Sequence, residues 1–343
     1  MTDDPTRPDP STGRPREARS AEAFADGVIA GVSDSPDHVP DSLRHDLDVW
    51  EGALAAGVTA KPQTQWQLFR RRFFRHKPAM VGLVTLTILI IACFGAPWLA
   101  PAAQNVQDLT AEATGPSLAH WFGVDDLGRD YFSEVLYAGR VSLAIGLGVG
   151  LLSTLIGSTV GLIAGYFGGW RESTLMRFTD LFLIIPQIAL LAVALQRFGK
   201  TPLIIILVLS FIFWMTIARV VRGQVLSLKE KEYVEAARAS GASSGRIMFR
   251  TILPNLVSVI TVNATLSVAA AIVTESTLSF LGFGIQRPQT SWGNMLSDAR
   301  GYVGTSKAHL IYFPGLMLLL VTLSINFLGD GLRDALDPQS DRS

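Results

Sequence analysis

Six stretches of this chain carry few or no charged side chains, and each is long enough to cross a lipid bilayer as a helix. An α-helix needs about 20 apolar residues to span a hydrocarbon core of about 30 Å. Inside that core only a helix or a closed barrel satisfies every backbone N–H and C=O group. We therefore expect an all-α integral membrane protein with about six transmembrane helices. They are predicted over Pro78 to about Ala100, within Val141–Trp170, and over Leu175–Leu195, Thr201–Ala218, Asn255–Ile285 and His309–Gly329.

The composition supports the prediction of a membrane protein and argues against disulfide bonds and metal sites. Charged residues make up 17% of the 343 residues, whereas soluble domains carry about 25%. The single cysteine, Cys93, excludes an intrachain disulfide, and the five histidines are scattered. The formal net charge of zero indicates nothing about partners. We expect no metal site, no cofactor bound by this chain and no nucleic-acid partner.

Residues 1–65 differ from the rest of the chain, because they are rich in Pro, Asp and Ala and show only weak apolar periodicity. Such a segment buries too little apolar surface to offset chain entropy, so a disordered or partly helical cytoplasmic tail is predicted. A basic segment with the first transmembrane helix follows at 66–100, and an extracytoplasmic loop at 101–139. The transmembrane core is predicted at 140–338, with a cytoplasmic loop at 219–253, and a short tail at 339–343.

The distribution of Lys and Arg orients the chain, because cytoplasmic loops carry an excess of both. With the N-terminus inside, the cytoplasmic segments hold 22 of the 29 Lys and Arg residues. Five of these, Arg70, Arg71, Arg72, Arg75 and Lys77, cluster directly before the first apolar stretch. We therefore expect a multi-pass protein of the cell membrane with both termini in the cytoplasm.

The second apolar stretch carries glycines at intervals that place them on neighbouring turns of a helix. They are Gly146, Gly150, Gly157, Gly161 and Gly165. Helices in lipid approach closely where glycine removes the side chains that would hold their backbones apart. This pattern favours tight packing within one subunit, and a dimer or pathway surface is the alternative.

Glu275 lies inside a predicted span, where a carboxylate costs about 2.5–3.5 kcal/mol on insertion scales. It should therefore face protein or water. A carboxylate satisfied by neighbouring groups is the favoured interpretation, and a role in the solute path or outer gate, together with Ser279, stays open. Asp180, near the cytoplasmic end of its span, is interpreted as an interfacial packing or coupling residue.

The predicted outer loop contains a cluster of charged residues and one of two tryptophans that we assign to the outer membrane interface. The charged residues are Asp125, Asp126, Arg129 and Asp130, and the tryptophans are Trp121 and Trp292. An ion-pair network that orders the loop is favoured over a cation site. Amphipathic indole rings are typical of the membrane–water interface.

The loop 219–253 contains two helix-forming segments that flank Gly241 and Gly245. Gly241 stands where the first of them should end, in a positive-φ conformation. Glu235 has Lys231 and Arg238 as neighbours on the same helix face, so an ion pair on a solvated surface is one interpretation.

A second interpretation of this loop comes from a family resemblance. Glu235-Ala236-Ala237, then Gly241, then Leu253-Pro254 resembles the cytoplasmic EAA loop of ATP-binding-cassette (ABC) importer permeases. In that family the loop forms two short coupling helices that dock onto an ATPase subunit. The isoleucine usual two places before the Leu-Pro pair is Thr251 in this sequence, a departure expected to alter packing more than docking.

Three further stretches, 120–130, 275–284 and 326–338, resemble the dipeptide, oligopeptide and nickel importer branch of those permeases. They look like the subunit with the large first outer loop, and the resemblance spans residues 66–338. It implies an importer-type permease fold that pairs with a second homologous permease subunit and contacts membrane lipid. It also implies two ATPase subunits, which would hold ATP and Mg²⁺, and an extracytoplasmic solute-binding protein. The chain would then transport and not catalyse.

The resemblance implies alternating access driven by ATP, with dipeptides or oligopeptides as the solute. Nickel or another small solute is the alternative within the family. A secondary transporter driven by an ion gradient, with Glu275 and Asp180 as carriers, is a different class that stays open. A membrane scaffold or sensor without solute flux is the other class of protein that stays open.

The predicted topology has a direct test. Cysteines placed at Ser117 and Ser340 should react from opposite sides of the membrane in intact cells, because 117 lies in the predicted outer loop and 340 in the cytoplasmic tail. Labelling with a membrane-impermeant maleimide, before and after permeabilisation, measures this. Reaction of both positions from outside would contradict the orientation.

Overall fold

The structure is a computed structural model that describes residues 65–108 and 114–336. The predicted tail at 1–65 therefore lies almost entirely outside the described residues, as does the short tail at 339–343. Within the described ranges the chain is helical, and its only β-structure is an isolated bridge between Val124 and Asp130. The all-α prediction is confirmed for this part of the chain.

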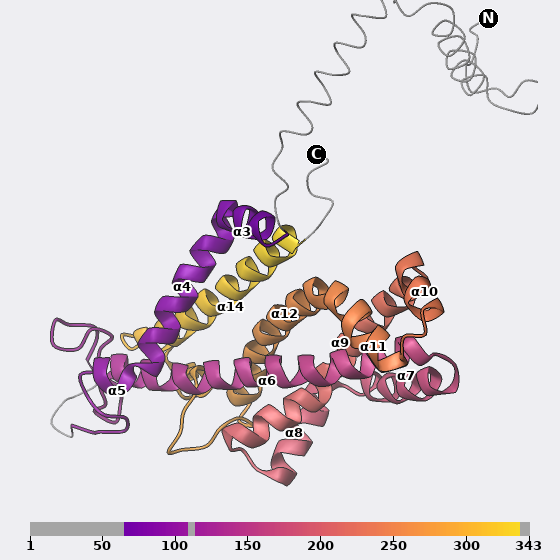
Figure 1. Ribbon diagram of the computed structural model, residues 1–343. Helices are drawn as coiled ribbons and strands as arrows, with labels where there is room; N and C mark the ends of the chain where they lie inside the picture. Colours follow the sequence, from indigo (N-terminus) through magenta and orange to yellow (C-terminus); the bar gives the residue numbers. More distant parts are fainter. Residues whose placement is uncertain (1–64, 109–113, 337–343) are drawn as a thin grey trace, which may run out of the picture. The chain divides into compact units, whose positions relative to one another are not determined.

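Five helical segments are long and apolar enough to cross a membrane, and the long helices form the frame of the molecule (Figure 1). The long helices are α4 (Lys77–Phe94), α6 (Tyr131–Phe167), α9 (Pro202–Leu228), α12 (Leu253–Phe280) and α14 (His309–Leu336). Short elements connect or extend them. These are α3 (Gln65–Arg75), α5 (Ala96–Leu99), α7 (Gly169–Ile184), α8 (Gln187–Phe198), α10 (Glu232–Ala239), α11 (Ser244–Arg246), a π-helix (Ile247–Ile252), α13 (Trp292–Ala299) and a 3₁₀ turn (Arg300–Tyr302).

The third predicted span is not a single helix. The sequence predicts one helix over Leu175–Leu195, but α7 and α8 meet at an angle of 91°. The break falls at Pro186, whose ring and missing N–H are incompatible with a helix interior. Ile185, before it, is extended, with φ −74° and ψ 134°, as a residue preceding proline prefers. The described residues therefore contain five helical segments that are long and apolar enough to cross a membrane, or six if this bent pair counts as one.

The longest helix, α6, packs against two other helices through its glycines. Gly146 and Gly150 lie against side chains of α12, and the remaining three lie against α9. A Cβ on Gly161, for example, would come 2.5 Å from the backbone oxygen of Ala218 and 2.8 Å from Val221 Cβ. The glycine face is therefore occupied by helices of the same chain.

The tryptophan expected at the outer interface at position 292 is in the core instead. Trp292 is completely buried, and its indole Nε1 donates a hydrogen bond of 2.9 Å to Val135 O of α6. The short helix α13 folds back onto α6, which the sequence pattern does not reveal. The prediction for Trp292 is therefore wrong. Trp121 is 62% exposed, and its ring lies edge-on against Phe132 at 5.0 Å.

The packing of α6 on α9 predicts unequal effects for two glycine substitutions. Gly161→Ala should destabilise the protein by about 1–3 kcal/mol, because the new methyl group collides with the α9 backbone. Gly223→Ala is the matched control, since a Cβ there meets nothing within 4 Å and alanine favours the helix. Thermal unfolding of the purified variants in detergent checks both. Equal unfolding temperatures for the two variants would contradict the close approach of α6 and α9.

Candidate functional site

The chain between α9 and α12, from α10 to the end of the π-helix at Ile252, forms a helical hairpin. The residues of the EAA-type pattern lie on this hairpin and at the start of α12. The first helix of the hairpin, α10, ends where two hydrogen bonds reverse the chain. Gly241 N donates to Arg238 O (3.0 Å), and Ala242 N donates to Ala237 O (3.1 Å), which are the two bonds of a Schellman motif. Gly241 has a φ of +75°, a conformation that glycine adopts without a Cβ clash. The helix end and the positive φ expected at this glycine are both present.

One side chain of α10 fixes the hairpin to the end of the helical bundle. Val234 is completely buried and belongs to an apolar cluster with Val225 of α9 and Ile252. The next two residues, Glu235 and Ala236, are exposed. The hairpin therefore has a fixed inner face and an open outer face on which a second protein can dock.

The π-helix joins the hairpin to α12 and ends directly before Leu253 and Pro254. Proline cannot donate a backbone hydrogen bond, and its ring clashes with the carbonyl four residues earlier in a regular α-helix. A wider π turn accommodates it, and Leu253 N donates to Met248 O, five residues back. Leu253 is half-buried and Pro254 is exposed. The pair therefore marks the point at which the hairpin becomes a spanning helix.

Glu235 makes no ion pair within the part of the chain that the structure describes. The pairing with Lys231 or Arg238 that its helical spacing allows is not formed. Its exposed carboxylate is thus available to a partner on the outer face of the hairpin.

Two ion pairs connect α7 to α9 near the same end of the molecule. Glu172 Oε1 accepts a hydrogen bond of 2.6 Å from Arg222 Nε, and Asp180 pairs with Arg219. The carboxylate at position 180, assigned from the sequence to packing or coupling, therefore contacts α9. A shift of α9 would be transmitted to α7 through these charges.

Glu275 is buried in α12 among serine hydroxyl groups. Only 1% of the residue is exposed, and Ser279 Oγ donates a hydrogen bond of 2.6 Å to its Oε1. Ser276 Oγ lies 3.5 Å from Oε2, and Ser291 Oγ donates to Ser279 Oγ at 3.3 Å. Ser291 is also the N-cap of α13, where it accepts a bond from Asn294 N. The carboxyl group therefore ties α12 to the start of α13, which supports the interpretation of a satisfied buried group.

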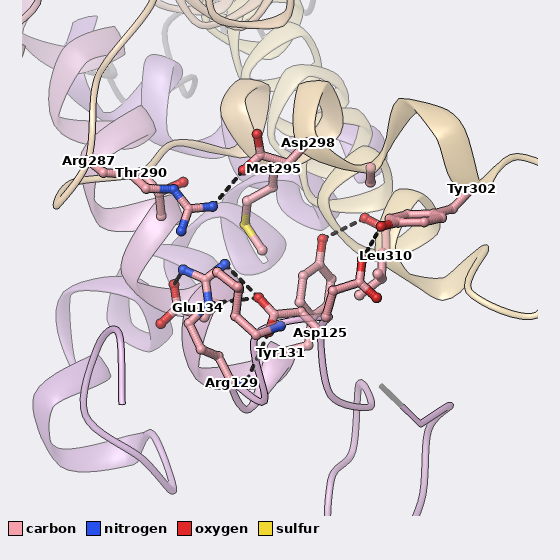
Figure 2. A pocket seen from close by; sticks show the side chains of 13 residues that line it. Asp125, Arg129, Tyr131, Glu134, Arg287, Thr290, Met295, Asp298, Tyr302 and Leu310 are labelled. Atoms are coloured by element: carbon pink, nitrogen blue, oxygen red, sulfur yellow. Dashed lines mark hydrogen bonds and ion pairs between the residues drawn. The ribbon is translucent and has the colours of Figure 1, made fainter. Parts of the chain in front are cut away.

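A cavity of about 250 Å³ opens at the opposite end of α6 (Figure 2). Its base is a buried charge network in which Arg129 Nε donates to Asp125 Oδ2 at 2.7 Å. The backbone N–H groups of Leu127 and Arg129 both donate to Asp125 Oδ1 at 2.9 Å. Glu134 Oε1 accepts a bond of 2.7 Å from Asn105 N, and Glu134 Oε2 lies 3.4 Å from Arg129. The predicted loop-ordering ion-pair network is present.

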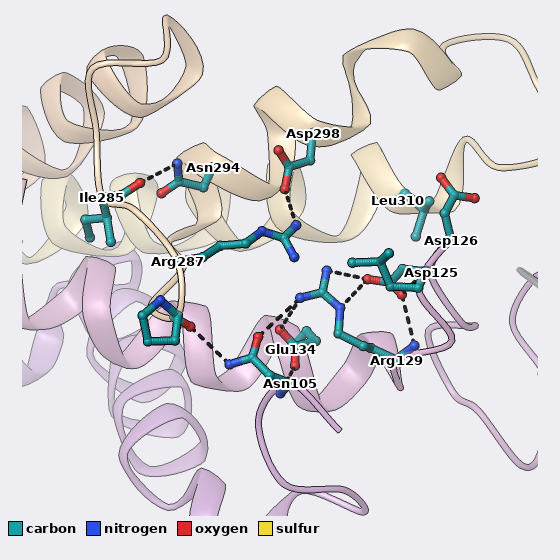
Figure 3. A network of polar contacts seen from close by, with 12 residues as sticks. Asn105, Asp125, Asp126, Arg129, Glu134, Ile285, Arg287, Asn294, Asp298 and Leu310 are labelled. Atoms are coloured by element: carbon teal, nitrogen blue, oxygen red, sulfur yellow. Dashed lines mark hydrogen bonds and ion pairs between the residues drawn. The ribbon is translucent and has the colours of Figure 1, made fainter. Parts of the chain in front are cut away.

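The rim of this cavity carries a second charged pair from a distant part of the chain (Figure 3). Arg287 donates a hydrogen bond of 3.0 Å to Asp298 on α13, and both side chains are more than half exposed. The cavity therefore presents positive and negative groups side by side. Such a surface can contact a zwitterion or a complementary charged protein face.

Two aspartates of the predicted outer loop have shifted pKa values. Burial alone would raise the pKa of Asp126, but hydrogen bonds from Lys307 and Tyr302 lower it below its usual range. Burial would likewise raise the pKa of Asp130, and its contacts with His120 and Ser133 lower it. Both carboxylates are therefore charged at neutral pH, and Asp130 caps α6 by accepting from Ser133 N at 2.8 Å.

A second cavity, of about 410 Å³, lies between α12 and α14. It is lined by Ser258, Val259, Val262, Asn263, Leu266, Arg333 and Leu336. Glu275 and Ser279 line neither cavity.

The structure separates the predicted site residues into three groups. The first group lies on or beside the hairpin and consists of Glu235, Ala236, Ala237, Gly241, Leu253 and Pro254. The second group, Glu275 and Ser279, lies in a buried cluster. The third group is the set of glycines through which α6 packs against its neighbours. The sequence analysis did not identify Glu134, Arg287 and Asp298, which line the cavity of about 250 Å³. Glu134 had a local signal, since it follows the N-cap Asp130 by one helical turn. Arg287 and Asp298 had none, because only the folded chain places them beside Arg129.

Comparison with known families identifies the chain. A family described as "Binding-protein-dependent transport system inner membrane component" matches residues 157–342, more than half of the chain. The chain belongs to this family, the membrane permease subunits of ABC importers. A second family, the "N-terminal TM domain of oligopeptide transport permease C", matches residues 64–116. The resemblance stated from the sequence motifs is therefore confirmed.

Two relatives show how far the similarity extends. The oligopeptide transport system permease protein OppC of Mycobacterium tuberculosis (strain ATCC 25618 / H37Rv) is 40% identical over 272 residues, which cover 79% of this chain and 93% of the relative. The glutathione transport system permease protein GsiD of Escherichia coli O6:K15:H31 is 41% identical over 293 residues, 84% of this chain and 96% of the relative. A chain of the MetNI methionine ABC transporter, solved in inward-facing conformations, has a TM-score of 0.47 and 21% identity over 57% of this chain and 93% of that chain.

The serine-lined carboxyl group predicts different effects for two substitutions. Glu275→Gln keeps an acceptor for Ser279 and should be tolerated. Glu275→Leu leaves buried hydroxyl groups unpaired and should cost about 1–3 kcal/mol. Thermal unfolding in detergent distinguishes them. An unfolding temperature for Glu275→Leu equal to that of the wild type would show that the hydroxyl contacts contribute nothing.

Proposed function

We propose that this permease subunit moves peptides into the cell as half of the solute pathway of an ATP-driven importer. The observation that carries the proposal is the identity of 40–41% with permeases named for oligopeptide and glutathione transport. Glutathione is itself a tripeptide, so both names describe short zwitterionic chains. The outer cavity, with Arg287 and Asp298 at its rim, has charges of both signs, which suits such a solute.

In the proposed assembly a second homologous permease completes the pathway, and two ATPase subunits bind ATP and Mg²⁺ in the cytoplasm. An extracytoplasmic solute-binding protein delivers the peptide. Both termini of this chain lie in the cytoplasm, as the excess of basic residues favours. Hydrolysis belongs to the ATPase subunits and not to this chain.

Coupling to the ATPase is proposed to run through the hairpin. Its outer face offers Glu235, Ala236 and Gly241 to a partner, while Val234 fixes its inner face to the bundle. When ATP closes the ATPase pair, the force would reach α9 and α12, which flank the hairpin. The spanning helices would then open outward.

Two alternative functions make different demands on the chain. Nickel or another small solute would use the same coupling route, so only transport assays separate it from peptide. A transporter driven by an ion gradient would need Glu275 or Asp180 as a carrier. The serine contacts of Glu275 and the Arg219 contact of Asp180 give both carboxylates structural partners, which favours the ATP-driven importer.

Uptake assays with hairpin variants test solute and coupling together. In cells that depend on this chain, Glu235→Lys should abolish uptake of a radiolabelled tripeptide while membrane abundance stays normal. The substitution reverses an exposed charge and adds repulsion to Lys231 and Arg238 on the same helix. Uptake of ⁶³Ni²⁺ should not depend on the chain at all.

Gly241 provides a matched pair for the same assay. Gly241→Val should also lose uptake, because a β-branched residue strongly disfavours a φ of +75°. Gly241→Asn should retain most uptake, since asparagine tolerates this conformation and no atom lies within 4 Å of the new Cβ. Wild-type uptake by Glu235→Lys and Gly241→Val, with the ATPase still co-purifying, would rule out the hairpin as the coupling element. Chain-dependent nickel uptake without peptide uptake would reassign the solute.

A further inference from the structure

The segment before the first spanning helix presents four exposed cations that no other group in the described chain neutralises. Arg70, Arg71 and Arg75 lie on α3, and Lys77 opens α4. None of them forms an ion pair with another residue of the described chain. We call these four residues the α3 basic surface.

The opposite face of α3 holds the helix against α14. Phe73 is buried in an apolar cluster with Ala79 and Ala335, and Phe69 stacks on Phe73 with ring centroids 5.9 Å apart. Between α3 and α4, His76 Nδ1 accepts a hydrogen bond of 3.1 Å from Ala79 N, and His76 Nε2 lies 3.4 Å from Asp334 of α14. The direction in which the basic surface points is therefore set by packing and capping.

The α3 basic surface continues into the most exposed apolar face of α4. Val81, Val84, Ile88 and Ile91 are each between 53% and 62% exposed and recur at helical spacing. Lys77 precedes Val81 by four residues, so it begins the same face. A face of this kind in a membrane protein contacts lipid tails, which places Lys77 and the neighbouring arginines at the level of the headgroups. Phe74, 58% exposed, lies among them and can insert at that boundary.

We propose that the α3 basic surface is a binding site for anionic phospholipid headgroups. The lipid phosphates neutralise cations that have no ion-pair partner among residues 65–108 and 114–336, and the adjacent face of α4 receives the acyl chains. A basic residue near an anionic membrane surface contributes about 1 kcal/mol, which corresponds to roughly fivefold in affinity. Removing three of the four charges should therefore weaken binding by more than tenfold.

The chain itself contains a competing anion. Residues 1–64 hold 12 Asp and Glu against 6 Lys and Arg, so they are acidic overall and directly precede α3. Charge alone does not distinguish this segment from a lipid. The continuity with the apolar face of α4 favours lipid. A phospholipid carries an anionic headgroup and apolar acyl chains in one molecule, so it matches both the basic surface and the four exposed aliphatic side chains.

The test is a titration of the purified full-length chain in a neutral detergent. Dioleoyl phosphatidylglycerol or dioleoyl phosphatidylcholine is added, and native mass spectrometry counts the retained lipid while thermal unfolding reports stabilisation. The wild type should bind phosphatidylglycerol at least tenfold more tightly than phosphatidylcholine, and the preference should shrink as salt rises. In Arg70→Gln/Arg71→Gln/Arg75→Gln the preference should disappear while phosphatidylcholine binding is unchanged.

Two further variants make the outcome decisive. Arg140→Gln/Arg197→Gln/Arg300→Gln removes three exposed cations elsewhere on the chain and should keep the preference. An equal loss in this control would show a general charge effect and overturn the site. Asp41→Asn/Asp46→Asn/Asp48→Asn/Glu51→Gln reduces the charge of the acidic segment. If phosphatidylglycerol preference appears only in this variant, the chain's own acidic segment occupies the surface and the proposal is wrong.

Discussion

Helices in a bilayer gain little from the hydrophobic effect when they associate, because lipid tails are as apolar as leucine, so close contact between backbones decides which helices pack. The packing of α6 depends on that constraint. Its glycines allow α9 to approach at Gly157 and Gly161 and α12 at Gly146 and Gly150. With 37 residues, α6 is about 55 Å long and extends beyond the hydrocarbon core. Its first turn lines the cavity of about 250 Å³, and its last turns pack into the apolar cluster that holds Val234 of the hairpin.

Polar groups secure the ends of this frame where glycine packing does not reach. At the N-terminal end of α6, Asp125 and Arg129 order the loop before the helix, and Asp130 caps the helix itself. Glu275 and Ser291 both hydrogen-bond to Ser279, and these contacts hold α12 against the start of α13. A buried carboxylate raises the free energy of the folded state unless its hydrogen bonds are complete. Each of these carboxylates therefore stabilises one particular arrangement of its partners. At the other end of the bundle, the first helix of the hairpin, α10, buries only Val234 and leaves most of its surface exposed.

A closely packed frame of helices with an exposed hairpin at one end suits a protein that transmits motion between two faces of a membrane. A permease coupled to a cytoplasmic ATPase needs one face that is open to its partner and helices stiff enough to carry displacement across the bilayer. Under the proposed function, the exposed hairpin would supply the first property, and the closely packed α6, α9 and α12 would supply the second. The ion pairs of Glu172 and Asp180 extend this connection to α7. Lipid bound at the α3 basic surface would hold the first spanning helix at a defined depth while the others move.

The sequence alone determined the helical membrane class, the family, the position of the hairpin and the turn at Gly241, because each depends on local composition, spacing or backbone conformation. The break at Pro186 could also have been predicted from the sequence, because proline disfavours a straight helix at that point. We nevertheless predicted one continuous span there. The tertiary structure alone decided where Trp292 lies, because an indole fits both a membrane interface and a core, and only the folding of α13 onto α6 selects one. It also decided that Arg287 and Asp298 line the same cavity as Arg129 and Glu134. The two pairs are more than 150 positions apart in the chain, and no local pattern encodes a cavity that forms only when distant segments pack together.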